Sequence, residues 1–273
     1  MRWRQGRGQL NFKDKNILDP LFITIGLGLS AACIGVLTGA TGIGGFLIIP
    51  ALVVLADLDI RTAIGTALVL GAASGLLGAK LYRGKGNLPW ALVIPLVIGA
   101  ACFAMLGGWL NQWLPVRLIA GALGFVMVVG SLCVLRRKKN GSDFPALLLT
   151  KYDSLLLVLI GCLSGLVAGL TGAGGPLISI PLMTALAYPV LASIGASQVM
   201  QIVACIFGVA IYWEAGNISW SALAIIVPLQ LIGTVFGVRL SHAVDSDLAS
   251  RSVALLGILG GIAILGLAVI KTL

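Results

Sequence analysis

The sequence predicts an all-α integral membrane protein with about eight transmembrane helices in two parallel repeats of four crossings, each containing a glycine-rich broken or re-entrant segment. Composition is the first observation behind this prediction: 59% of the residues are apolar, 10% are charged, and the mean hydropathy is +1.09. The others are a series of apolar runs of bilayer length and an internal duplication. Soluble domains carry about 25% charged residues, so a water-soluble fold is excluded.

The apolar runs define the predicted helices. A helix needs about 20 residues to cross the hydrocarbon core of a bilayer. Eight runs are mostly that long, and four lie in each half of the chain: 17–37, 63–81, 90–110, 116–135, 155–170, 192–213, 220–240 and 252–270.

The duplication is visible as a glycine motif that occurs twice. Thr41-Gly42-Ile43-Gly44-Gly45 recurs 130 positions later, from 41 to 171, as Thr171-Gly172-Ala173-Gly174-Gly175. The same offset relates the Ile-Gly pairs at 64–65 and 194–195, the Gly-Asn pairs at 86–87 and 216–217, and the tryptophans at 90 and 220. A unit of roughly 130 residues is therefore used twice.

Two apolar pieces are too short to cross a bilayer alone. They occupy positions 46–56 and 176–187, directly after the glycine motifs. Each motif fits either a break within one extended crossing or the mouth of a re-entrant hairpin. In both cases we expect 17–56 and 155–187 to make one net crossing each.

Basic residues orient the predicted helices. With a cytoplasmic amino terminus and eight net crossings, fourteen of the eighteen Lys and Arg residues face the inside. The other four, Arg61, Arg117, Arg239 and Arg251, face the outside, in keeping with the excess of positive charge in cytoplasmic loops. If each short piece were a further span, the basic clusters at 80–85 and 136–139 would lie outside. We therefore reject that topology. The sequence thus predicts a multi-pass protein of a prokaryotic inner membrane with both termini cytoplasmic.

The chain divides into four segments on this basis: a basic amino terminus at 1–16, a first repeat at 17–135, a cytoplasmic linker at 136–153 and a second repeat at 154–273. The net charge of +9 and the basic run at 136–139 superficially suggest nucleic acid. Basic loops beside membrane helices are more often topology signals that contact anionic lipid. We therefore expect membrane lipid and no nucleic acid as a partner.

The glycine motifs are the strongest candidates for a functional site. Non-helical backbone is tolerated at membrane depth only where protein or a water-filled cavity surrounds it. A short helix that restarts after such a break presents free amides and a positive dipole end, which attract anions. We expect the substrate site to include Thr41, Gly42, Gly44, Gly45, Thr171, Gly172, Gly174 and Gly175. The alternative is that these glycines serve only close helix packing.

Three polar residues on one predicted helix add side-chain candidates. Gln198 and Gln201 are three positions apart and so share a helix face, with Ser197 beside them. Polar groups at this depth usually face the interior of the bundle, where these residues either bind substrate or tie helices together. Their counterparts in the first half are apolar at Leu68 and Gly71, so the predicted site is asymmetric.

Catalysis is not expected. The sequence contains no buried carboxylate pair, no Ser/His/Asp set and no cysteine spacing typical of a metal site, so we predict no enzyme activity, no metal and no cofactor. The five cysteines lie in apolar runs and are interpreted as small apolar fillers.

The ordered, twice-repeated pattern resembles the sulfite exporter TauE/SafE family. The pattern runs Thr-Gly-x-Gly-Gly, an apolar half-helix with Pro50 or Pro181, Ile-Gly, and then a Gly-Asn turn before a Trp-led helix. The resemblance covers about 25–267 and implies a permease for small sulfur-containing or carboxylate anions, such as sulfite or sulfonates. The second copy departs from the first where Pro176 replaces Phe46.

The predicted mechanism is alternating access around a site framed by the two glycine motifs. Few carboxylates are available for obligatory proton coupling, although a proton can travel with the substrate itself. An anion channel and a non-transporting membrane scaffold or assembly protein are the rival hypotheses. A carrier saturates and shows counterflow, a channel supports single-channel current, and a scaffold moves no solute.

Overall fold

The computed structural model describes residues 18–84, 88–135, 151–173, 175–186 and 188–240, together with 251, 255, 258–262 and 264–266. Regular structure in these ranges is helical throughout, and seven helices are long and apolar enough to cross a membrane. The predicted fold class of an all-α integral membrane protein is confirmed. The elements are α1 (Leu18–Thr41), η2 (Gly45–Leu47), α2 (Ile48–Leu55), α3 (Ile60–Gly84), α4 (Trp90–Trp113), α5 (Val116–Leu135), α6 (Lys151–Thr171), α7 (Pro176–Ala185), α8 (Val190–Glu214) and α9 (Trp220–Leu240).

Each glycine motif is the tip of a re-entrant hairpin. α1 has 24 residues, enough to cross a bilayer alone, and α2 then returns beside it. A side chain added at Gly26, near the start of α1, would lie 3.8 Å from Leu55 Cδ1 at the end of α2. In the second repeat Asp153, near the start of α6, hydrogen-bonds Tyr188, just beyond the end of α7. The chain therefore comes back to the face from which it entered.

The prediction of one net crossing for each of these stretches is wrong. The predicted first helix ended at position 37, whereas α1 continues to Thr41 and completes a crossing before the break. α2 then runs back alongside α1, toward the face where α1 begins. A hairpin of this kind adds no net crossing.

The two repeats are inverted, which corrects the prediction that they run parallel. α3 and its repeat counterpart α8 pack antiparallel, since Gly65 faces Tyr212 while Gly75 faces Ile202. The hairpin adds no net crossing, so the first repeat crosses the membrane three times, through α3, α4 and α5. Because three is an odd number, the second repeat starts from the opposite face. An axis in the membrane plane therefore relates the halves.

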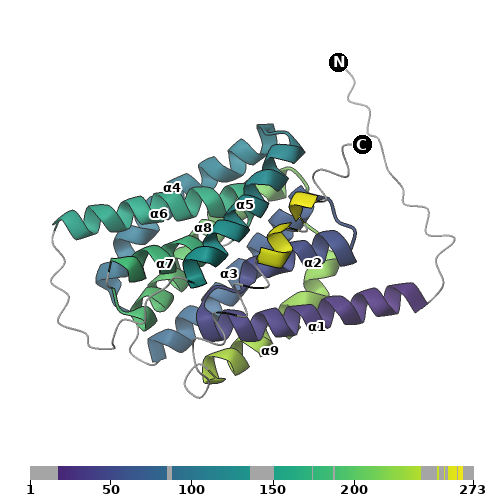
Figure 1. The fold of residues 1–273 in the computed structure, drawn as a ribbon, viewed down its shortest axis with the longest axis horizontal. Helices are drawn as coiled ribbons and strands as arrows, with labels where there is room; N and C mark the ends of the chain where they lie inside the picture. Colours follow the sequence, from purple (N-terminus) through teal and green to yellow (C-terminus); the bar gives the residue numbers. More distant parts are fainter. Residues whose placement is uncertain are drawn as a thin grey trace.

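Glycine contacts join helices from different repeats on either side of this central pair. α1 runs beside α9, where Gly35 meets the Gln230 backbone and Gly39 the Thr234 backbone. α4 runs beside α6 in the equivalent way, because Gly99 meets the backbone of Val158. Figure 1 shows the α1 and α9 pair along one side, the α4 and α6 pair along the other, and α3 with α8 between them. Small residues allow this close approach in membranes.

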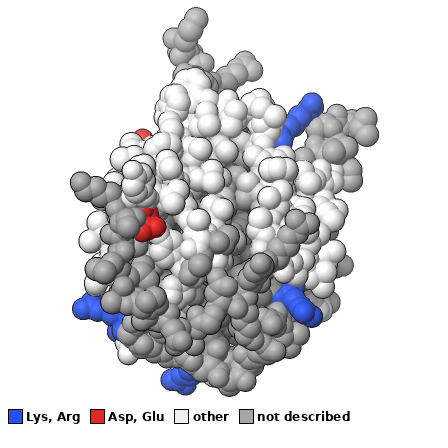
Figure 2. Space-filling model, turned by 60° about the vertical axis from the view of Figure 1, so that its left-hand side comes forward, with Lys and Arg blue, Asp and Glu red and all other residues white. Residues whose placement is uncertain are grey.

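The inversion redistributes the charges. We call the membrane face where α1 begins the α1 face and the opposite one the α6 face. The described basic residues Arg61 and Arg117 lie at helix ends on the α1 face, and Lys80, Arg83, Lys151 and Arg239 lie at helix ends on the α6 face. Arg251 precedes a helical segment that packs antiparallel to α5, so it also lies on the α6 face. Figure 2 brings the left side of Figure 1 forward and shows basic side chains toward the edges of the view and acidic side chains on its left. The prediction placed Arg239 on the same side as Arg61 and Arg117, and this assignment is wrong.

The eighth predicted helix, 252–270, lies mostly outside the described residues. Its described positions 258–262 and 264–266 are helical. Gly261 packs beside Val128 of α5, and Gly260 packs beside Pro50 of α2 and Met127 of α5. The first hairpin is thus held between α1 and this segment.

Candidate functional site

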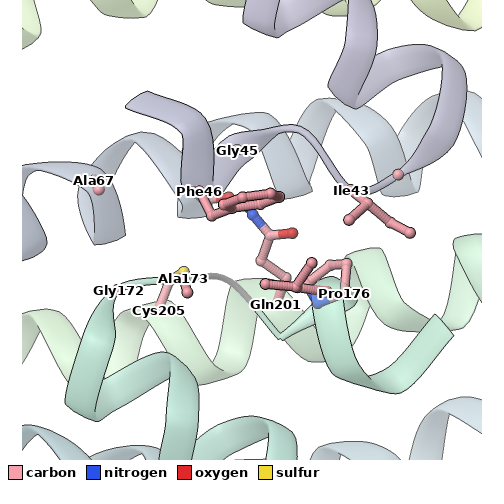
Figure 3. A pocket seen from close by; sticks show the side chains of 12 residues that line it. Ile43, Gly45, Phe46, Ala67, Gly172, Ala173, Pro176, Gln201 and Cys205 are labelled. Carbon is pink, nitrogen blue, oxygen red and sulfur yellow. The ribbon is translucent and has the colours of Figure 1, made fainter. Parts of the chain in front are cut away.

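The two glycine motifs meet at one small cavity near the axis that relates the repeats. The first hairpin contributes its tip and Phe46, the second contributes its tip and the first turn of α7, and α3 and α8 close the sides (Figure 3). The residues that line the cavity are Gly42, Ile43, Gly45, Phe46, Ala67, Gly71, Gly172, Ala173, Pro176, Leu177, Gln201 and Cys205. None of these side chains carries a charge.

Both breaks have the same backbone geometry. Gly42 and Gly172 take φ values of 77° and 66°, in the left-handed region that glycine adopts without a steric cost. Each amide donates to the carbonyl four residues back, Gly42 to Thr38 and Gly172 to Ala168, at 2.8 Å in both cases. A side chain at Gly42 would also lie 2.8 Å from Ile194 Cγ2. Conformation and space both require glycine here.

The two threonines fix these turns. The Thr41 hydroxyl donates to the Leu37 carbonyl at 2.8 Å and accepts from the Ile43 amide at 3.2 Å. Thr171 makes the same pair of bonds, to the Val167 carbonyl at 2.7 Å and from the Ala173 amide at 3.2 Å. The hydroxyl proton is used within the turn. The threonines therefore shape the breaks and do not present a free donor to the cavity.

Several backbone amides beside the cavity have no hydrogen bond within the described part of the chain. In the first hairpin these are the amides of Gly44, Gly45 and Phe46, since the first bond of η2 starts from Leu47. In the second hairpin it is the amide of Gly175, the repeat counterpart of Gly45. Unpaired amides at the start of a helix suit an anionic oxygen.

The carbonyls freed at the breaks have side-chain partners that the sequence analysis did not identify. The Tyr82 hydroxyl donates to the Gly39 carbonyl at 3.3 Å, and the Tyr212 hydroxyl donates to the Gly169 carbonyl at 2.9 Å. Asn111 donates to the Leu170 carbonyl at 2.7 Å. The two tyrosines are 130 positions apart, so the repeat offset was a signal that could have found them.

Gln201 is the single predicted side-chain ligand that lines the cavity. It is 3% exposed, and its Nε2 donates to the Gly71 carbonyl at 3.0 Å across the interface of α3 and α8. Figure 3 shows the side chain between the two hairpins, with its amide oxygen directed toward the side where Ile43 and Pro176 lie. Gln201 and Gly71 are repeat counterparts, so this bond lies on the axis itself.

The other two predicted ligands lie away from the cavity. The Ser197 hydroxyl pairs with the Ser179 hydroxyl at 2.7 Å, which ties α8 to α7. Gln198 is 1% exposed, and its Oε1 has no partner among the described residues. Its side chain faces Gly78 of α3.

The remaining predicted glycines support the hairpins from behind. A side chain at Gly44 would meet the Thr38 backbone, and one at Gly175 would meet Met200 and Ser164. Neither residue lines the cavity. Gly174 lies outside the described residues.

The cavity is closed in this conformation. Its volume is about 10 Å³, close to what a single water needs. In the described ranges no three His, Cys, Asp or Glu residues come together as a metal site. The chemistry available at the cavity is thus backbone amides, one primary amide and one thiol.

Comparison with known proteins identifies one family and several relatives that are described as probable membrane transporters. The family model for "Sulfite exporter TauE/SafE" matches residues 27–264. The chain is 25% identical to the "Probable membrane transporter protein YdhB" of Bacillus subtilis, over 85% of this chain and 96% of that one. It is 22% identical to the "Probable membrane transporter protein MJ0441" of Methanocaldococcus jannaschii, over 89% and 94% of the respective chains. No solved structure matches significantly.

Proposed function

The chain belongs to the sulfite exporter TauE/SafE family, and from that premise we propose that it is a secondary transporter for a small sulfur-containing or carboxylate oxyanion. Membership of the family, with relatives described as membrane transporters, supports a multi-pass membrane transporter and a non-enzymatic role. The observation that carries the finer proposal is the pair of re-entrant hairpins, whose unpaired amides meet at one uncharged cavity.

The proposed binding site uses the hairpins as a backbone cradle. Gly42, Gly44 and Gly45 belong to the first turn, and Gly172 and Gly175 belong to the second, each shaped by its threonine, Thr41 or Thr171. The predicted contribution of Gly174 falls outside the described residues. Free amides of both hairpins donate to the anion, and Gln201 contacts it from α8. Ser197 and Gln198 support Gln201 from the same helix, with Ser197 anchored to α7.

Alternating access follows from the inverted symmetry. In this conformation the cavity is too small for sulfite, which corresponds to an occluded state. Two hairpins related by an axis in the membrane plane can open in turn, one toward each face, without a change in the site between them. A continuous channel requires an open path at all times, whereas here Ile43 and Phe46 face Ala173 and Pro176 across the cavity.

The proposed location is the inner membrane of a prokaryote. The described C-terminal helix packs antiparallel to α5, because Gly124 meets Leu265 while Val128 meets Gly261. Both ends of the transmembrane region therefore fall on the α1 face. The expectation that both termini are cytoplasmic relied on single net crossings. With five described basic residues on the α6 face against two on the α1 face, we propose that the α6 face is cytoplasmic.

Counterflow in proteoliposomes tests the proposed transport function. Vesicles preloaded with unlabelled sulfite, a sulfonate or a small carboxylate should accumulate the labelled form of the same anion transiently, and the rate should saturate. Single-channel current in a planar bilayer would instead support a pore. Absence of both fluxes for every anion tested, from protein that reconstitutes as a folded species, contradicts the proposal.

A further inference from the structure

Deepening the proposed transport function, we infer that the transported species carries a hydrogen-bond donor of its own. It is a singly charged or neutral oxyacid with an O–H group, such as hydrogensulfite, and the fully deprotonated dianion is excluded. The inference rests on the proposed function, on the orientation of the Gln201 amide and on the absence of charge in the cavity.

The orientation of Gln201 is fixed by chemistry. Its amide nitrogen faces the Gly71 carbonyl at 3.0 Å, and a carbonyl oxygen can only accept. The same carbonyl accepts from the Ser74 hydroxyl at 3.1 Å. A flipped amide would place two acceptor oxygens against each other, so the assigned orientation is the stable one.

This orientation leaves the Gln201 oxygen as an acceptor at the cavity. Gln201 is 3% exposed, and its Oε1 accepts no hydrogen bond in the described part of the chain. Unlike the Oε1 of Gln198, this oxygen is not fully buried, so it is accessible from the cavity. Figure 3 shows the oxygen directed into the space between the hairpins. An accessible acceptor at this position favours a ligand that donates a hydrogen bond to it over a ligand that presents only acceptors.

The cavity therefore offers two kinds of contact. Amides of Gly45 and Phe46 can donate to negative oxygens, while Gln201 accepts a proton-bearing group. A protonated oxyanion has both functions on one small centre. A dianion has only acceptors, and it would place a lone pair against the Gln201 oxygen.

The uncharged lining of the cavity also favours a protonated substrate over a dianion. None of the twelve residues that line the cavity is Lys, Arg or His. A second negative charge in a water-poor site without a cation carries a large desolvation cost. The proton that neutralises this charge is carried by the substrate, so no carboxylate of the protein has to bind and release it.

The first test is the pH dependence of sulfite counterflow at a fixed total concentration. Sulfite and hydrogensulfite interconvert near neutral pH. The initial rate should follow the hydrogensulfite fraction, which falls about tenfold per pH unit on the alkaline side. A rate that rises with the dianion overturns the inference while leaving transport itself established. Absence of counterflow for every anion overturns the proposed function instead.

The second test compares competitors of equal charge. Methanesulfonate is a monoanion like hydrogensulfite but has no O–H group. It should compete with labelled sulfite at least about tenfold more weakly than unlabelled hydrogensulfite does, the loss expected for one hydrogen bond to a buried acceptor. Equal competition overturns the inference.

Variants of Gln201 connect this selectivity to the amide. Gln201→Leu should slow sulfite counterflow and abolish the discrimination against methanesulfonate. Gln201→Glu keeps an acceptor oxygen while protonated, so it should transport at low pH and lose activity more steeply than the wild type as pH rises. Gln230→Leu is the matched control, because Gln230 is buried in α9, forms no side-chain hydrogen bond in the described structure and does not line the cavity. Unchanged discrimination in Gln201→Leu, with a folded protein, contradicts the assignment.

Discussion

The two repeats share their backbone but not their chemistry. The breaks at Gly42 and Gly172 have matching φ values, matching amide bonds and matching threonine bonds. Across the axis, however, Gln201 faces Gly71, and Phe46 has Pro176 as its counterpart. The duplicated backbone supplies two similar turns, whereas the side chains at their junction differ between the repeats.

Site-directed labelling offers the largest contrast between the repeats, because its outcome is all or none. Leu58→Cys lies between α2 and α3 on the α1 face, and Leu88→Cys precedes α4 on the α6 face. A membrane-impermeant maleimide should modify these two positions from opposite sides. Tyr188→Cys, at the end of the second hairpin, should behave like Leu88→Cys. Labelling of Tyr188→Cys together with Leu58→Cys from one side contradicts the inversion.

Substitution of the turn glycines should have the largest effect on transport. Gly42→Ala and Gly172→Ala place a Cβ at positive φ, 2.8 Å from Ile194 and 3.0 Å from Ile64 respectively. Left-handed backbone costs a residue with a side chain roughly 1–2 kcal/mol, and the contacts add to this. Counterflow should fall to background in both variants, measured with protein whose membrane insertion is verified.

Gly216→Ala is the matched control for this experiment. Its φ is 71°, but nothing lies within 4 Å of the added Cβ, and it sits in the turn between α8 and α9. The backbone strain in Gly216→Ala is similar to that in Gly42→Ala, but Gly216 is remote from the cavity. Loss of transport in Gly216→Ala equal to that in Gly42→Ala would mean that strain alone, rather than the hairpin geometry, abolishes activity.

Removal of the tyrosine hydroxyls should have an intermediate and unequal effect. Tyr82→Phe and Tyr212→Phe each leave a buried carbonyl at the end of α1 or α6 without its side-chain partner, at a general cost of roughly 1–3 kcal/mol. The bond from Tyr212 is the shorter one, 2.9 Å against 3.3 Å. We therefore expect the larger decrease in thermal stability and counterflow rate for Tyr212→Phe. The reverse order would indicate that the first hairpin depends more on its tyrosine.

The smallest expected effect concerns the link between the second hairpin and α8. Ser179→Ala removes the hydroxyl pair with Ser197, a contact that the first repeat lacks because the counterparts are Ile49 and Ala67. Loss of about 1 kcal/mol should lower the melting temperature in detergent by about 2–4 °C. The double variant Ile49→Ser with Ala67→Ser in the first repeat provides the comparison, and a stabilised protein there would show that this helix pair tolerates the same contact.

The sequence predicted the helices and the two breaks because those depend on local composition. Glycine runs within apolar segments indicate non-helical backbone at membrane depth, and the duplication indicates two of them. The direction of the chain after Thr41 was not predictable in this way. It depends on whether the hairpin folds back against α1 or continues away from it, which is a matter of packing against α3 and the other repeat.

Individual side-chain roles also depended on contacts that the sequence does not reveal. The hydroxyls of Thr41 and Thr171 were expected to bind substrate, but each is satisfied within its own turn. Gln198 and Gln201 looked equivalent by spacing, yet only Gln201 lines the cavity. Their difference arises from the position of α3, because Gly71 presents its carbonyl to the Gln201 amide whereas Gln198 faces Gly78.

The hydrogen bond between Gln201 and Gly71 has a consequence for how such a molecule arises. At this point a residue meets its own copy, so an assembly of two identical half-sized chains would have to place two glutamines or two glycines there. Only after the half-sized unit was duplicated could the two positions mutate independently. Divergence of the two copies is therefore a requirement for having a single, uniquely oriented acceptor at the centre, and joining them in one chain keeps the unlike halves paired.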